Sequence, residues 1–224
     1  MVETIMIDFN LIVKSLPALW RGTLLTLKIS FFGCAIGLIL GTILGIAQTS
    51  KLPIINYFIN FFITIIRGTP MLIQIFIVRY VFPQFGIVLP LVWAAILAIG
   101  INSSAYVSQI IRSGILSVSK GQIEAAQTLG LSRWQIMRQI VLPQAFQTVF
   151  PVLGNELITL VKDSSLASAI GVAELTQEAS HIRSVTYDAL TTYLAVAVIY
   201  LILTSLLSLV FNRIEKRISR HVTN

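Results

Sequence analysis

Charged residues are scarce in this chain. Only 11% of its 224 residues are Asp, Glu, Lys or Arg, whereas 56% are apolar. A soluble domain carries roughly a quarter of charged residues. The shortage excludes an ordinary soluble domain and indicates a chain that lies in a lipid bilayer. The net charge of +7 comes from basic residues that gather between apolar runs, so we expect no nucleic-acid partner.

Cysteine and histidine are equally rare, with one cysteine, Cys34, and two histidines, His181 and His221. A single cysteine in an apolar run excludes a disulfide framework, and isolated histidines do not form a metal cluster. The sequence also has no GxxxxGK[ST] phosphate loop, no HExxH and no GxSxG motif. We therefore expect no metal, no cofactor and no enzymatic activity in the chain itself.

Long apolar runs are what the sequence does have. A bilayer is crossed by about 20 apolar residues in a helix, and the chain has five runs of sufficient length. We predict an all-α membrane protein whose domain over residues 22–215 holds five transmembrane helices. The helices are expected over residues 22–48, 54–82, 91–111, 143–161 and 189–211.

The two ends of the chain differ from this domain. Residues 1–21 alternate apolar with polar or charged residues, and their first charges are acidic, unlike the basic start of a signal peptide. We expect a retained amphipathic helix in the membrane interface over residues 1–21. Residues 216–224 form a basic tail that we expect in the cytoplasm.

Glycines recur every four residues in the first apolar run. This spacing places them on one helix face, where their small size lets a second helix approach closely. We therefore expect a close helix packing contact along Gly33, Gly37, Gly41 and Gly45.

The basic residues between the runs predict the orientation of the chain. Lys51, the segment from Arg112 to Arg138 and the C-terminal tail together carry the whole net charge. Cytoplasmic loops of membrane proteins are enriched in Lys and Arg. We therefore predict that these three segments are cytoplasmic, which places the N-terminus outside.

Several polar groups lie within the apolar runs, where lipid cannot satisfy them. The tetrad Arg67-Gly68-Thr69-Pro70 interrupts the second run, so it must line a cavity or be buried in protein. In the third run, Asn102 and Ser103 could bond a neighbouring helix or contact a polar solute. Both readings stay open from the sequence.

The fourth run carries two carboxylates, Glu156 and Asp163, with Lys162 beside them. Their spacing of seven residues puts both on one helix face, about two turns apart. A charged group in a spanning helix indicates a functional site, although a structural salt bridge with Arg67 or Lys162 is the alternative. Residues 164–187, which include Glu174, are expected to form an exposed or re-entrant segment.

Between the third and fourth runs, residues 122–144 predict a helix, a glycine turn and a second helix at the membrane surface. Gly130 allows a left-handed turn that ends the first helix. Ser132 is expected to cap the second helix. Leu142-Pro143 is expected to close that helix and to open the next one, because proline disfavours helical geometry at the residue before it.

These residues resemble a known family. The pattern Glu124-Ala125-Ala126, Gly130, Ile140 and Leu142-Pro143 resembles the EAA loop of the membrane-spanning subunits of ATP-binding-cassette (ABC) importers. Three further motifs resemble the polar amino acid branch of that family, and the resemblance covers about the whole chain. These motifs are Arg67-Gly68-Thr69-Pro70, Asn102-Ser103-Ser104-Ala105-Tyr106 and Gly154-Asn155-Glu156 followed by Lys162-Asp163-Ser164-Ser165-Leu166.

The resemblance implies the fold of a type I ABC importer permease in the cytoplasmic (inner) membrane. Residues 120–140 would hold the coupling helix, which docks on a separate ATPase subunit that binds ATP. The further partners would be a second permease chain, identical or related, and an extracytoplasmic amino-acid-binding protein. The coupling residues would be Glu124, Ala125, Ala126, Gly130, Leu142 and Pro143.

The substrate is predicted from charge. Two carboxylates on one face favour a solute with a cationic side chain, so we expect import of polar, in particular basic, amino acids. Glutamine or cystine is the alternative if Arg67 neutralises Glu156. Two other classes are a proton-coupled secondary transporter, with the carboxylates as proton relay, and a membrane anchor for a soluble enzyme. The candidate substrate-binding residues are Glu156, Asp163, Lys162, Asn102, Ser103, Arg67 and Thr69.

Overall fold

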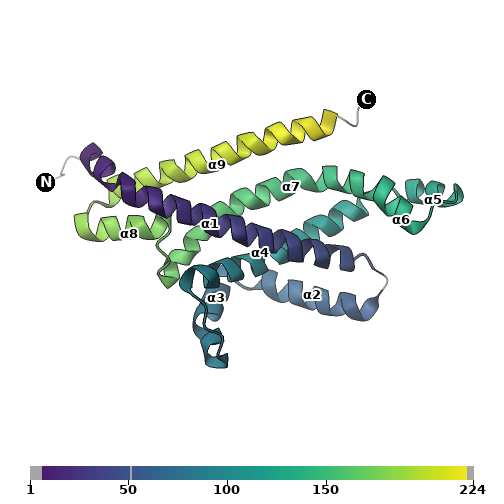
Figure 1. Ribbon diagram of the computed structural model, residues 1–224, viewed down its shortest axis with the longest axis horizontal. Helices are drawn as coiled ribbons and strands as arrows, with labels where there is room; N and C mark the ends of the chain where they lie inside the picture. The colour runs from purple at the N-terminus through teal and green to yellow at the C-terminus, as the bar shows by residue number, and fades with distance from the viewer. Residues whose placement is uncertain (1–6, 51, 221–224) are drawn as a thin grey trace.

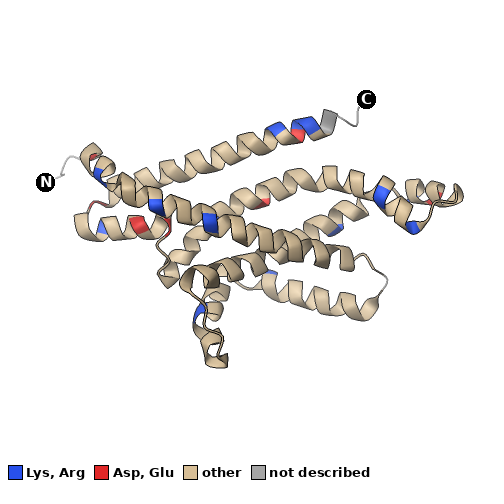
Figure 2. Ribbon diagram, viewed as in Figure 1, with Lys and Arg blue, Asp and Glu red and all other residues tan. Residues whose placement is uncertain are grey.

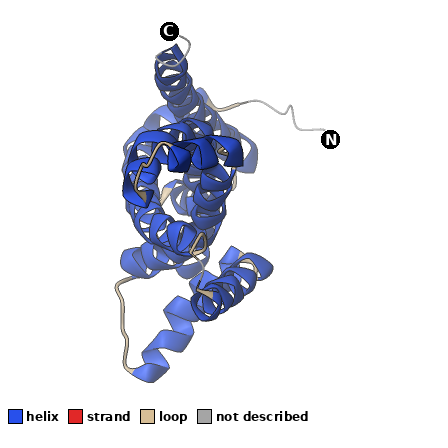
Figure 3. Ribbon diagram, turned by 90° about the vertical axis from the view of Figure 1, so that its right-hand side faces the viewer, coloured by secondary structure: helices blue, strands red, loops and turns tan. Residues whose placement is uncertain are grey.

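The computed structural model describes residues 7–50 and 52–220, and this part of the chain is helical throughout, without strands (Figure 3). The prediction of an all-α protein is confirmed for these residues. Residues 1–6, 51 and 221–224 lie outside the described residues. Parts of three predicted features fall on them, namely the N-terminal segment, the first turn (Lys51) and the basic tail. The α-helices are α1 (Phe9–Ala47), α2 (Pro53–Gly68), α3 (Met71–Phe76), α4 (Leu91–Leu116), α5 (Lys120–Thr128), α6 (Arg133–Ile136), α7 (Leu142–Asp163), α8 (Leu175–Thr186) and α9 (Ala189–Arg220). They are joined in part by the π turns η1 (Ile77–Val81) and η3 (Met137–Val141) and the 3-10 turns η2 (Phe82–Phe85) and η4 (Ser164–Ile170).

Three helices in the described residues are long and apolar enough to cross a membrane: Phe9–Ala47, Leu91–Leu116 and Ala189–Ile218. The bent pair Pro53–Gly68 and Met71–Phe85 would form a fourth span if the two halves cross together. Helix α7 has 22 residues, but polar and charged side chains are spread along it. The fold therefore contains three or four candidate spans by length and composition.

Helix α1 begins well before the predicted first span. It runs without interruption from Phe9 to Ala47, and the Asp8 carboxylate caps its first turn by accepting hydrogen bonds from the backbone N–H groups of Asn10 and Leu11. Residues 9–21 are thus not a separate helix, and their position in the membrane interface stays a prediction. Phe9 and Trp20 are exposed on this segment, as side chains in contact with lipid would be.

The glycine-lined face of α1 packs against α4, which confirms the predicted close contact. A Cβ atom added to Gly33, Gly37, Gly41 or Gly45 would lie 2.6 to 2.9 Å from an atom of α4. Real Cβ atoms essentially never come so close, so only glycine allows this approach. Helices α1 and α4 form the most extensive helix pair of the described residues, and the polar residues Asn102 and Ser103 of α4 are buried in the interior.

The elements are distributed along one long axis. The turn after α1, the α5–α6 element and the C-terminal end of α9 lie at the same end of the molecule, at the right in Figure 1. Helix α8 and the start of α1 lie at the opposite end. Basic residues of the α5–α6 region and of the end of α9 therefore gather at one end, as Figure 2 shows.

The tetrad of residues 67–70 breaks the second apolar run, as predicted. The axes of Pro53–Gly68 and Met71–Phe85 differ in direction by 103°. Thr69 and Pro70 have extended backbone angles, which end α2 and set the new direction of α3. The turn between the two helices faces α4 and α7.

The α5–α6 element has the predicted local structure at its centre. Gly130 has a positive φ of 78°, the left-handed conformation that glycine adopts most readily. Ser132 caps α6, because its hydroxyl accepts from the N–H of Gln135 while the Gln135 side chain accepts from the N–H of Ser132. The predicted helix, turn and capped helix are confirmed.

The prediction that Leu142-Pro143 closes the second helix is wrong. Helix α6 continues through η3 directly into α7, and Leu142 itself has helical angles (φ −60°, ψ −43°). The Leu142 N–H donates to the carbonyl of Met137, five residues earlier. Such a wider turn leaves room for the ring of Pro143, whose missing N–H is not needed in the first turn of α7.

The segment between α7 and α9 is exposed only in part. His181 and Arg183 of α8 are exposed, but Glu174 at the start of α8 is completely buried. Helix α8 packs against α1 and α9, and Leu175 contacts the backbone at Gly22 closely enough to exclude a Cβ atom there. The segment is therefore not exposed at Glu174, and the alternative of a re-entrant segment stays a prediction.

Candidate functional site

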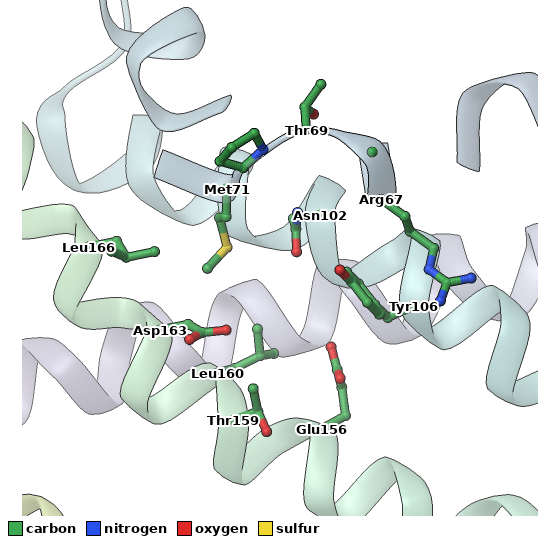
Figure 4. A pocket seen from close by; sticks show the side chains of 12 residues that line it. Arg67, Thr69, Met71, Asn102, Tyr106, Glu156, Thr159, Leu160, Asp163 and Leu166 are labelled. Carbon is green, nitrogen blue, oxygen red and sulfur yellow. The ribbon is translucent and has the colours of Figure 1, made fainter. Parts of the chain in front are cut away.

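A cavity of about 470 Å³ opens between the α2–α3 turn, α4, α7 and η4. Its volume lies within the range of roughly 300–1,000 Å³ that is usual for small-molecule sites. Figure 4 shows the side chains that line it. They are Arg67, Gly68, Thr69, Pro70, Met71, Asn102, Tyr106, Glu156, Thr159, Leu160, Asp163 and Leu166.

Helix α7 supplies the acidic wall of the cavity. Glu156 and Asp163 both line it, which confirms that the two carboxylates face the same side. Seven residues of α-helix correspond to about 10 Å along the axis, so the two groups mark two separate positions in the cavity. Each is half-buried, and Glu156 accepts a hydrogen bond of 3.0 Å from the Ser103 hydroxyl of α4.

The α2–α3 turn supplies the opposite wall. The guanidinium of Arg67 lies 5.2 Å from the centre of the Tyr106 ring, a cation–π distance. Figure 4 shows this pair at one side of the cavity, with Arg67 exposed. The recorded contact of Arg67 is thus with an aromatic ring, whereas that of Glu156 is with a hydroxyl.

The other predicted site residues differ in where they lie. Asn102 is buried and lines the cavity, and Ser103 is buried behind Glu156 without lining it. Thr69 lines the cavity, but its hydroxyl donates to the carbonyl of Ile65 and accepts from the Gln74 side chain. Lys162 is exposed and is not among the lining residues.

Several lining residues are not among the predicted substrate-binding residues, and they include Tyr106, Thr159, Leu160, Met71 and Leu166. Thr159 lies one helical turn from both Glu156 and Asp163, so the helical period that relates the carboxylates also finds it. Met71 and Leu166 line the cavity with apolar surface, for which the sequence gives no distinguishing signal.

The balance of charge decides what this cavity can hold. Two carboxylates and one guanidinium line it, and that guanidinium is exposed and contacts a ring. The cavity offers positions for cationic groups and, at Arg67, one for a carboxylate. Among the described residues, no group of three or more His, Cys, Asp or Glu side chains is arranged to hold a metal ion.

The predicted coupling residues form a separate region at the end of the molecule (Figure 1). Glu124, Ala125 and Gly130 are exposed, whereas Ala126 is buried against the neighbouring helices. Leu142 and Pro143 are exposed at the start of α7. Helix α7 thus connects this region to the carboxylates of the cavity through one continuous element.

A helical bundle with long apolar helices and a charged cavity defines a membrane transport component. The model of the family described as "Binding-protein-dependent transport system inner membrane component" matches residues 33–220. The chain belongs to this family and is a multi-pass protein of the inner membrane.

Relatives of known function agree. The chain is 41% identical to the glutamine transport system permease protein of Escherichia coli (strain K12), with 94% of this chain and 97% of the relative covered. It is 36% identical to the arginine transport system permease protein of Bacillus subtilis (strain 168), with 95% and 97% covered.

A solved structure matches as well. The crystal structure of an amino acid ABC transporter with histidines is 38% identical, with a TM-score of 0.89 and 95% of this chain and 100% of that chain covered. The predicted resemblance to ABC importer permeases of the amino acid type, and the corresponding fold, are therefore confirmed. Such permeases are transport subunits, and the ATPase activity of their importers lies in a separate chain.

Proposed function

We propose that this chain is the permease subunit through which an ABC importer moves polar amino acids, in particular those with a cationic side chain. The observation that carries the proposal is the cavity with Glu156 and Asp163 on one wall. A zwitterion with a cationic side chain carries two positive groups and one carboxylate. The two carboxylates of α7 and the guanidinium of Arg67 are equal in number to these three charges, and each has the opposite sign to the group that it would bind.

The chain crosses the membrane five times in this proposal, with α7 as the remaining span and the N-terminus outside. The charged, cavity-facing side of α7 explains why it is less apolar than the other spans. The gathering of basic residues at the end that holds α5–α6 supports a cytoplasmic location for that end (Figure 2).

The α5–α6 element and the start of α7 then dock on an ATPase subunit in the cytoplasm through the exposed Glu124, Ala125, Gly130, Leu142 and Pro143, while Ala126 packs beneath this surface. In support, Leu129 is 81% exposed and Trp134 is 67% exposed on either side of the Gly130 turn, an apolar surface outside the candidate spans. A second permease chain and an extracytoplasmic amino-acid-binding protein complete the importer. ATP is bound by the partner, and the chain needs no cofactor of its own.

Glutamine is the second candidate substrate. The relative that is named for glutamine transport is at least as similar to this chain as the one named for arginine. A neutral side chain would need only one of the two carboxylates, which would leave the other as a structural group bonded to Ser103. A proton-coupled secondary transporter has less support, because it gives the exposed α5–α6 element no purpose.

Uptake by proteoliposomes tests the proposal. The permease is reconstituted with its ATPase, and the cognate binding protein is added outside with labelled arginine or glutamine. The variant Glu156→Gln should reduce ATP-dependent arginine uptake about tenfold relative to glutamine uptake, as expected for loss of a bond to a charged group. Glu215→Gln, which removes a carboxylate outside the cavity, serves as the matched control.

Three outcomes are distinguishable. Selective loss of arginine uptake in Glu156→Gln supports a cationic substrate. A preference for glutamine in wild type and variant alike would support an importer whose substrate is glutamine and would contradict a cationic substrate. Uptake that needs no ATP would refute the importer itself.

A further inference from the structure

Gln74 of α3 is a buried polar residue that does not line the cavity. Its side-chain NH₂ has two hydrogens and lies within hydrogen-bond distance of three oxygen atoms at the end of α2, so that one N–H is shared between two of them. These are the carbonyl oxygen of Ile66 at 2.8 Å, the carbonyl oxygen of Thr69 at 3.2 Å and the Thr69 hydroxyl oxygen at 2.8 Å. Gln74 thus satisfies carbonyl groups that the end of a helix leaves without partners.

The chemistry of these three partners fixes the orientation of the Gln74 amide. Two of them are carbonyl oxygens, which only accept, and the Thr69 hydroxyl already donates its hydrogen to the carbonyl of Ile65. The group that faces them must therefore be the NH₂ of Gln74. Its oxygen, Oε1, is left to point toward α4.

The orientation of the Gln74 amide in turn determines that of the Asn102 amide in α4. Its Nδ2 donates to Oε1 of Gln74 at 3.1 Å, and Oε1 can only accept. The amide of Asn102 is therefore fixed with its NH₂ toward Gln74 and its oxygen away from it. Figure 4 shows that the Asn102 oxygen points to the side of the cavity where Glu156 and Asp163 lie.

We propose that Gln74 is a specificity-determining residue that acts through Asn102, holding the Asn102 carbonyl oxygen in the cavity so that it binds a positively charged group of the solute. The proposal rests on the proposed function, namely that the cavity holds the amino acid. Three acceptor groups, those of Asn102, Glu156 and Asp163, then face the solute together. With the Asn102 amide reversed, two N–H donors would face the cavity and would favour a carboxylate instead.

The roles of the two amides are different. Asn102 touches the solute, whereas Gln74 is a positioning residue one step behind it. Because Gln74 also closes the α2–α3 turn, it sets both the shape of the cavity wall and the sign of the group that Asn102 presents. A purely structural role would affect all solutes equally, so discrimination between solutes is the decisive measurement.

The experiment measures equilibrium binding to the complex of the permease with its ATPase in lipid nanodiscs. The probes are L-arginine, citrulline, which lacks the side-chain charge, and des-amino arginine, which lacks the α-ammonium group. For Gln74→Met we expect about tenfold weaker arginine binding and a loss of the preference for arginine over one of the two analogues. Gln84→Met, the same change at an exposed site in η2, is the matched control and should bind as wild type does.

Asn102→Leu keeps all three bonds of Gln74 to the end of α2 and removes only the amide in the cavity. It should show the same loss of preference, and this result stays informative if Gln74→Met does not fold. In the double variant the two effects should not add, because both act through one group. Equal weakening of all three probes in Gln74→Met, or an unchanged preference in Asn102→Leu, would overturn the inference while leaving the cavity as the binding site. Absence of any amino acid binding to the wild-type complex would overturn the proposed function and the inference with it.

Discussion

Glu174 is completely and Glu156 partly shielded from bulk water, but the two carboxylates differ in how many hydrogen bonds the chain supplies to them. Glu174 is completely buried where α1, α8 and α9 meet. It accepts four hydrogen bonds, from the hydroxyls of Thr26 and Tyr200 and from the backbone N–H groups of Thr176 and Gln177. Glu156 is half-buried, accepts one hydrogen bond from Ser103 and faces a cavity.

This contrast separates a structural carboxylate from one that is available to a solute. A carboxylate offers about four acceptor positions, and the chain itself fills those of Glu174. Burial raises the pKa of the Glu174 carboxyl, and its hydrogen bonds, from Thr176 and Gln177 first, oppose that shift. Glu156 keeps most of its acceptor positions open toward the cavity, which is the condition for binding a cationic group.

The largest expected effect comes from Glu174→Ala, which tests the structural role of the buried carboxylate. The change removes the N-terminal cap of α8 and leaves buried donors without partners. A lost cap costs about 1 kcal/mol, and each buried unsatisfied donor costs about 1–3 kcal/mol. We expect unfolding to be easier by about 3 kcal/mol or more, measured as a lower unfolding temperature of the purified protein in detergent.

The control for this prediction is Glu124→Ala on the exposed face of α5. It should leave the unfolding temperature unchanged and should instead reduce the ATP dependence of transport. An unfolding temperature of Glu174→Ala equal to that of wild type would contradict the structural role of Glu174.

Those parts of the fold that depend on local sequence could be predicted. The glycine spacing in α1, the break at residues 67–70, the left-handed turn at Gly130 and the cap at Ser132 each follow from residues close together in the chain. Pro143 was misread because a π turn, which has no clear sequence signal, carries the helix past it.

In the site too, features that depend on residues close together in the chain could be predicted, whereas those that depend on distant residues could not. The common face of Glu156 and Asp163 follows from helical period, and Thr159 could have been found in the same way. The burial of Glu174 could not be predicted, because its partner Thr26 lies 148 residues earlier in the chain. The exclusion of Lys162 from the cavity could have been predicted from the same helical period, because adjacent residues of an α-helix point about 100° apart and Lys162 therefore leaves the face of Asp163.

A smaller effect is expected from Tyr200→Phe, which removes one of the four donors to Glu174. The hydroxyl of Tyr200 also contacts that of Thr176 at 3.1 Å, so Thr176 loses a partner as well. We expect a loss of about 1 kcal/mol in the free energy of unfolding, with amino acid selectivity unchanged. Tyr193→Phe, on an exposed part of α9, should change neither property. A change in selectivity would show that the region around Glu174 is coupled to the cavity and that its role is not purely structural.

The smallest effect on stability is expected at the other carboxylate, from Ser103→Ala. Glu156 loses its one recorded hydrogen bond, but water in the open cavity can replace it, so the free energy of unfolding should fall by less than about 1 kcal/mol. The freed carboxylate is less well oriented toward the solute, and the ratio of arginine to glutamine uptake should fall about threefold. Ser104→Ala is the matched control, because the Ser104 hydroxyl is buried and, within the described residues, bonds the carbonyl of Ile101 in its own helix and no group of the cavity. A loss of stability as large as that of Glu174→Ala, with the uptake ratio unchanged, would assign Glu156 to the same structural class as Glu174 and would remove the main support for a cationic substrate.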